Sequence, residues 1–192
     1  MVDDKKHSIT TGVDGPSTSH VSVKRLSFEI LSQIFLDCLP ETGFPSVWTH
    51  EAPVILGRIC SQWRSVSLRT PQLWAGLDLG SNRTDYTKDA MAAAEWKTRA
   101  GSCLLSYCLW HTPDILDVIL PHCTQWRHFE AHLELDGWKQ VYAAICQGAP
   151  RLQYLELHMI NRPLSLWSAT QIDIRVPIPG ATGLQTLCAC YH

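Results

Sequence analysis

The sequence lacks a strong excess of charge of either sign. Its 192 residues contain 16 Lys and Arg against 18 Asp and Glu, a formal net charge of −2 at pH 7. This balance argues against a nucleic-acid partner bound mainly through its phosphates. Hydrophobic residues make up 45%, which is too many for a mostly disordered chain. Collagen, coiled-coil and low-complexity biases are missing too, so we expect one ordinary folded domain or two small ones.

Long hydrophobic runs are also missing. No stretch approaches the roughly 18 apolar residues of a membrane-spanning helix, and residues 1–22 lack the apolar segment of a secretory signal. We therefore expect no membrane association and a cytoplasmic or nuclear location. The eight cysteines would then stay reduced, and their position inside apolar segments such as 34–39 favours buried thiols.

Sequence motifs of common enzymes are absent as well. The chain contains no G-x-S-x-G, no P-loop and no H-E-x-x-H. Nothing in the sequence arranges a nucleophile, a base and an orienting group, so we predict no catalytic residue and no cofactor. The eight Cys and nine His leave a Cys-dependent enzyme open as an alternative.

Alternating ligand-type residues occur in two places. On a strand, one face would carry three of them near the C-terminus: Cys188, Cys190 and His192. A zinc site normally needs a fourth ligand and spacing such as C-x-x-C, which is absent, so no metal site is predicted. His128 and His132 also share a face, and we interpret them as strand-surface residues because only Glu130 and Glu134 are nearby.

Helical periodicity begins at residue 26. Apolar residues recur at three- and four-residue steps over 26–39, which predicts a helix that Ser27 caps at its start. The helix is apolar nearly all round and therefore has more apolar surface than a small bundle can bury.

Three further helices follow in the first half of the chain. Pro53 fits the first turn of a second helix over 54–69. Thr70, followed by Pro, predicts the cap of a short third helix, and this role explains the Thr-Pro pair more simply than phosphorylation does. An Ala-rich fourth helix is predicted over 84–100, with Gly101 at its end.

The second half alternates strand-like and helical patterns. Helical stretches over 112–120 and 136–147 separate the first three strand-like runs. Starting the runs at Ser102, Trp126, Leu152 and Leu184 gives steps of 24, 26 and 32 residues. Strand-then-helix units at such steps predict a solenoid in which each unit buries its face against the next. The four runs cover residues 102–110, 126–135, 152–159 and 184–191.

The N-terminal residues resemble an F-box. The matching pattern reads Leu26-Ser27-x-Glu29-Ile30-Leu31-x-x-Ile34-Phe35-x-x-x-Leu39, then Ile59-Cys60-x-x-Trp63-Arg64, then Pro71-x-Leu73-Trp74. More closely, this segment is similar to the F-box-like proteins of mushroom-forming fungi. In that family irregular leucine-rich repeats follow, and Trp96, Arg99 and Gly101 resemble the segment that introduces them.

The resemblance implies a partner and a set of contact residues. F-box modules bind the Skp adaptor of cullin-RING (SCF) ubiquitin ligases, and the repeats that follow select a protein substrate. One departure is that Ser27 stands where the family usually has Pro. The residues that would form or support the adaptor surface are Leu26, Ile30, Leu31, Ile34, Phe35, Leu39, Ile59, Trp63 and Trp74.

Together these observations predict an α + α/β fold, a three-helix F-box module followed by a short, incomplete leucine-rich-repeat-like solenoid. The expected parts are a disordered tail over 1–22, an F-box-like domain over 23–80, a linking helix over 81–101 and the repeat region over 102–192. Because no polar capping unit follows the last strand-like run, we expect a fragment or a truncated relative of a longer protein.

The expected function is substrate recognition within an SCF-type ubiquitin ligase. The chain would bind a Skp-type adaptor through the F-box-like part and an unknown protein substrate through the repeats. Two alternatives stay open: a repeat-type interaction module without ligase association, and a truncated relative without function. The departure at Ser27 motivates the first of them.

Overall fold

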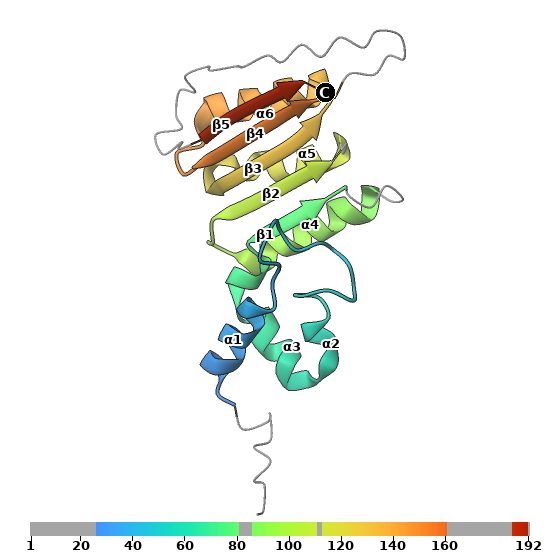
Figure 1. Cartoon of the computed structure of the whole chain (residues 1–192), viewed down its shortest axis with the longest axis vertical. Coiled ribbons are helices and arrows are strands. Elements are labelled where there is room, and N and C mark those ends of the chain that lie inside the picture. The colour runs from blue at the N-terminus through green and yellow to red at the C-terminus, as the bar shows by residue number, and fades with distance from the viewer. Residues whose placement is uncertain (1–25, 81–85, 111–112, 161–185, 192) are drawn as a thin grey trace, which may run out of the picture.

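The computed structural model describes residues 26–80, 86–110, 113–160 and 186–191. The predicted tail over 1–22 lies outside these described residues. The molecule is elongated, with a helical module at one end and a sheet backed by helices at the other (Figure 1). The chain therefore combines helices with a parallel sheet, which agrees with the predicted combination of α and α/β structure.

The first helix, α1 (Phe28–Asp37), begins where the sequence predicts. Ser27 is extended, and the backbone N–H of Ile30 donates to its Oγ at 3.4 Å, which confirms the predicted cap. The helix buries Leu31 and Phe35. The burial of one apolar face and the hydrogen bond at the first turn therefore fix the position of α1.

The predicted continuous helix over 54–69 is wrong. The structure has two short helices, α2 (Leu56–Ile59) and α3 (Ser61–Leu68), because Cys60 between them is extended, with φ −156° and ψ 172°. This residue turns the chain so that the two helices pack against each other. Pro53 precedes α2 and does not lie in its first turn.

The short third helix is present as a 3-10 helix, η2 (Pro71–Trp74), but the predicted cap is wrong. The Thr70 hydroxyl makes no capping bond. It donates instead to the carbonyl of Val66 at 2.8 Å and lies 3.0 Å from Ser32 Oγ. Thr70 is therefore buried between α3 and α1, where its hydroxyl links the two helices.

Five parallel strands form one sheet and pair in chain order. The four predicted strand-like runs are confirmed as β2 to β5, and β1 is an additional strand that the sequence analysis did not predict. It lies inside the range 23–80 and joins the helical module directly to the sheet. The strands are β1 (Gly76–Leu79), β2 (Leu105–Trp110), β3 (Trp126–Leu133), β4 (Tyr154–Met159) and β5 (Thr186–Tyr191).

The helices between the strands all cover the same face of the sheet (Figure 1). Gly101 has φ +57°, which confirms its expected place at the end of α4. The helical segment predicted to stop at Pro121 continues through that residue as 3-10 helix. None of the described helices is long and apolar enough to cross a membrane. The elements are α4 (Tyr86–Ala100), α5 (Pro113–Ile119), η3 (Leu120–Gln125) and α6 (Leu135–Gly148).

One continuous core runs through the described residues, from α1 to β4. Alternate strand residues enter it from the sheet, because successive strand side chains point to opposite faces. Trp74 of η2 contacts Trp96 of α4 with ring centroids 4.8 Å apart, which joins the helical module to the helices behind the sheet. The buried strand residues include Leu77, Leu79, Leu105, Tyr107, Leu109, Phe129, Ala131, Leu133, Leu155, Leu157 and Met159.

The loop between α1 and α2 reaches back to the first strand. The backbone N–H of Asp78 donates to the carbonyl of Pro45 at 2.9 Å. A Cβ on Gly76 would lie only 3.0 Å from the ring of Phe44, so a larger residue at this strand position would have to displace that ring by a few tenths of an ångström. The loop therefore covers the free edge of β1, which would otherwise expose unpaired backbone groups.

Candidate interaction surface

Two isoleucines of α1 are exposed although the helix is strongly apolar. Ile30 is 53% exposed and Ile34 is 42% exposed, whereas Leu31 and Phe35 are 1% and 0% exposed. Residues four apart share one face of a helix, so Ile30 and Ile34 form a short apolar strip. Buried Leu31 and Phe35 cannot contact a partner directly, and they hold the helix that presents this strip.

The other expected contact residues are distributed differently. Leu26, Leu39 and Trp63 are partly buried against the core, and Trp74 is buried. Ile59 is 57% exposed, but it ends α2, which packs mainly on α3. The structure therefore brings Ile30 and Ile34 together and leaves Ile59 on a separate element.

One exposed apolar residue of the helical module was missed by the sequence analysis. Leu68, the last residue of α3, is 45% exposed. Its neighbours Val66 and Ser67 are buried, so the apolar periodicity of the segment does not separate Leu68 from the core positions. The module thus has exposed apolar side chains on three of its helices.

The charges on α1 are acidic. The helix contains Glu29 and Asp37 and has no Lys or Arg. The backbone N–H of Glu29 and the hydroxyl of Ser27 hold the pKa of the Glu29 carboxyl below its usual value. The helix that carries the apolar strip therefore has acidic side chains of its own, while the guanidinium of Arg69 lies 4.9 Å from the ring of Phe28 at its start.

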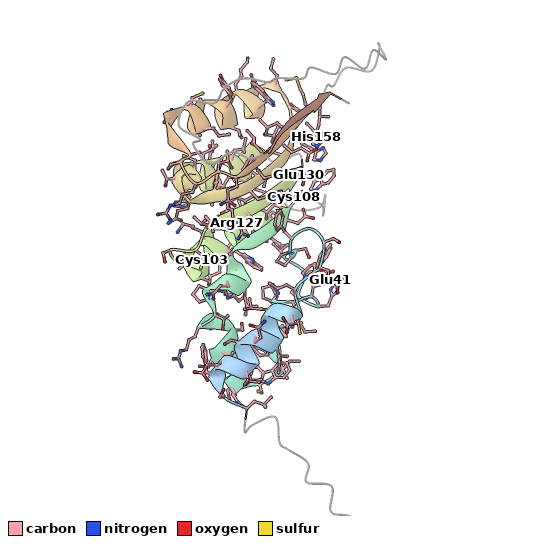
Figure 2. The ribbon with its side chains drawn as sticks, turned by 60° about the vertical axis from the view of Figure 1, so that its left-hand side comes forward. Glu41, Cys103, Cys108, Arg127, Glu130 and His158 are labelled. Carbon is pink, nitrogen blue, oxygen red and sulfur yellow. The ribbon has the colours of Figure 1, made fainter. Side chains whose placement is uncertain are left out.

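The second feature is the face of the sheet on which the described residues place no helix, here called the open face, and its side chains are mostly half-buried or buried. In Figure 2 its labelled residues Cys108, Glu130 and His158 project from the side away from the helices. The strand registers place alternate residues of β1 to β4 in rows across this face. Its residues are Asp78, Ser106, Cys108, Trp110, His128, Glu130, His132, Tyr154, Glu156 and His158.

Flat rings stack across the open face. The ring centroids of Trp110 and His132 are 3.9 Å apart and their planes differ by 9°. His132 stacks in turn on His158 at 4.2 Å and 6°. A parallel stack joins His128 and Tyr154 at 4.1 Å. The two histidines predicted as strand-surface residues therefore lie on the open face, each within a cross-strand stack.

Burial and nearby carboxylates raise the pKa of two groups on the open face. Burial, with Glu130 and Asp89 nearby, raises the pKa of Asp78 to about 6. Burial, together with the neighbouring carboxylates of Glu130 and Asp78, raises the pKa of the Cys108 thiol to about 12. A raised thiol pKa is the opposite of the activation that a nucleophilic cysteine needs.

The sequence contains a pattern that indicates this grouping of carboxylates and histidines on the open face, and the sequence analysis did not recognise it. A Glu-x-His pattern occurs in β3 at Glu130 and His132 and again in β4 at Glu156 and His158. The register between β3 and β4 places the two glutamates opposite each other and the two histidines opposite each other. The same rows continue to positions 188 and 190 of β5, both cysteines, while residue 192 lies outside the described residues.

Comparison of the chain with models of known families, with curated proteins and with solved structures gave no match. The geometry of its own residues and the resemblance of its N-terminal segment to the F-box therefore carry the functional argument.

Proposed function

We propose that this chain is a substrate-recognition subunit of an SCF-type ubiquitin ligase. Its F-box-like part, within 23–80, binds a Skp-type adaptor, and its repeat region, within 102–192, holds a protein target. The contribution to catalysis is positional, because the chain brings the target close to the ubiquitin-transferring subunits and supplies no reacting group.

The exposed Ile30–Ile34 strip is the observation that carries this proposal. Both residues belong to a helix that is capped, packed and otherwise satisfied, so folding of this chain does not explain their exposure. In the resemblance to the F-box they fall at positions of the adaptor surface. An apolar strip that the described part of the chain leaves uncovered is typical of a surface that a partner buries.

The arrangement of the second half supports a recognition role. Strands pair with their sequence neighbours, and the helices that the structure describes between them all lie on the face opposite the open face. This order is compatible with leucine-rich-repeat-like units, in which the strand face binds the target. The open face also presents stacked rings that include Trp110 and Tyr154, and aromatic residues are enriched in protein interfaces.

The test is binding of the purified chain to a fungal Skp adaptor, measured by isothermal titration calorimetry. Ile30→Asp and Ile34→Asp each place a carboxylate in the proposed interface, and we expect each to weaken binding by about tenfold or more. Leu31→Asp is unsuitable, because Leu31 is buried and the change would unfold the module.

Met91→Asp is the matched control. Met91 is 70% exposed on α4, so the change also replaces an exposed apolar side chain by a carboxylate but lies outside the module. We expect it to bind the adaptor like the wild type. The proposal is wrong if the wild-type chain does not bind the adaptor. It is also wrong if the Ile30→Asp and Ile34→Asp variants bind the adaptor as tightly as the wild type.

The alternative, an interaction module without ligase association, has one observation in its favour. Ser27, which replaces the family's usual Pro, already satisfies the first turn of α1, so the helix is complete without the family's entry residue. Recovery of a target on the repeat region from cells, with no Skp or cullin subunit present, would favour this alternative.

A further inference from the structure

Three potential metal ligands converge on the open face from two neighbouring strands. Glu130 and His132 come from β3 and His158 from β4, and one donor atom of each lies within 4.8 Å of those of the other two. Figure 2 shows Glu130 and His158 on the same side of the sheet. The two-residue period of a strand places Glu130 and His132 side by side, and the register adds His158.

The charges around this cluster favour a cation. Glu130 and Glu156 are direct register partners, and like charges in opposite positions of a sheet destabilise it. Within the described part of the chain, the ion pairs of these two glutamates are made only with histidines: His128 and His132 at 3.9 Å from Glu130, and His158 at 3.1 Å from Glu156. A divalent ion held beside these paired carboxylates would offset their mutual repulsion.

We propose that Glu130, His132 and His158 bind one divalent transition-metal ion, with zinc as the metal that fits best. Imidazole ligands select zinc and its neighbours over magnesium and calcium, which prefer oxygen ligands alone. Two histidines and one carboxylate form a known set of three protein ligands for zinc, with the fourth position open.

Neighbouring residues support this ligand set. Glu156 Oε1 lies 3.1 Å from Nε2 of His158, the position of a carboxylate that orients a metal-binding histidine and increases its basicity. The strand register also places residue 190, a cysteine, beside His158. The fourth position of the ion can be taken by water or by a group from a partner.

Binding requires a small local rearrangement. Two ligands of a tetrahedral zinc ion with bonds of about 2.1 Å lie about 3.4 Å apart, compared with the present limit of 4.8 Å. The rings of His132 and His158 are within 6° of parallel, so their lone pairs lie in parallel planes. Side-chain rotation must turn them toward one point and separate His132 from Trp110.

The experiment is a zinc titration of the full chain in competition with a chromophoric chelator. Glu130→Gln, His132→Ala and His158→Ala each remove one donor, and we expect each to weaken zinc binding by about tenfold or more. His128→Ala is the matched control. His128 lies on the same strand and the same face, 3.9 Å from the other oxygen of Glu130, but outside the donor set, so its loss should leave the affinity unchanged.

X-ray absorption of the zinc-loaded chain distinguishes this site from binding by unrelated thiols. We expect nitrogen or oxygen neighbours at about 2.0–2.1 Å, and a shell of sulfur alone at about 2.3 Å would overturn the proposal. It is also overturned if the three variants, shown to be folded by circular dichroism, bind zinc as tightly as the wild type and the His128→Ala control.

Discussion

Neighbouring residues of α1 contribute very differently to stability. Phe35 is fully buried and its ring lies 4.9 Å from that of Trp63, whereas Ile34 is exposed. We expect Phe35→Ala to lower the free energy of unfolding by about 3–5 kcal/mol, because it removes core contacts and leaves a cavity. Ile34→Ala should change it by about 0.5 kcal/mol or less. Urea unfolding of both variants measures the difference, and similar losses would contradict the assignment of the two faces.

Asp78 makes stability depend on pH. Its pKa is raised to about 6 in the folded chain, so the native state takes up a proton at this group before the unfolded state does. The contribution of Asp78 to the free energy of unfolding therefore increases as pH falls from about 7 to about 4. The shift corresponds to about 3 kcal/mol at full strength, which the partial exposure of Asp78 reduces to about 1–2 kcal/mol.

The variant Asp78→Asn tests this pH dependence. The amide cannot ionise, so at pH 7.5 we expect the variant to be more stable than the wild type by about 1–2 kcal/mol. At pH 4 both side chains are uncharged in the folded state, and the difference should disappear. Urea unfolding at a series of pH values measures it, and a difference independent of pH would show that Asp78 does not titrate as described.

At the scale of elements, the sequence predicts those whose hydrophobic period is long and regular. The strand-like runs of β2 to β5 and the helix ended by Gly101 are in place, because burial of one face determines both the period and the structure. The break at Cys60 was not predictable, since the apolar pattern continues across it. β1 was missed because four residues are too few for a period to be recognised.

The contact between η2 and α4 connects the two ends of the molecule. The rings of Trp74 and Trp96 meet edge to face, and the guanidinium of Arg99 lies 4.2 Å above Trp74. We expect Trp96→Ala to lower the free energy of unfolding by about 3–5 kcal/mol. Met91→Ala, a change at an exposed position of the same helix, should cost about 0.5 kcal/mol or less. Equal effects in thermal unfolding would contradict this role of the contact.

At the scale of the whole molecule, the proposed metal site combines residues that are far apart in the sequence. The resemblance of the N-terminal segment to the F-box points to Ile30 and Ile34 from the sequence alone, because both residues lie within one helix. The cluster on the open face joins His132 to His158 through the pairing of β3 with β4, and strand order and register are not visible in a single sequence. The repeated Glu-x-His pattern indicates only which residues could meet once that pairing is known.

The continuous core predicts that the described parts of the chain unfold together. Phe35 and Leu73 in the helical module belong to the same cluster as Phe129 in the sheet, and the loop residue Pro45 is hydrogen-bonded to Asp78 of β1. We expect one cooperative transition, with circular dichroism and tryptophan fluorescence giving the same midpoint. Phe35→Ala should lower that midpoint for both signals and should reduce hydrogen-exchange protection of β3 as well as of α1. A variant that loses protection in α1 but keeps it in β3 would show that the helical module and the sheet are independent folding units, because a shared core transmits a cavity at one end to the stability of the other.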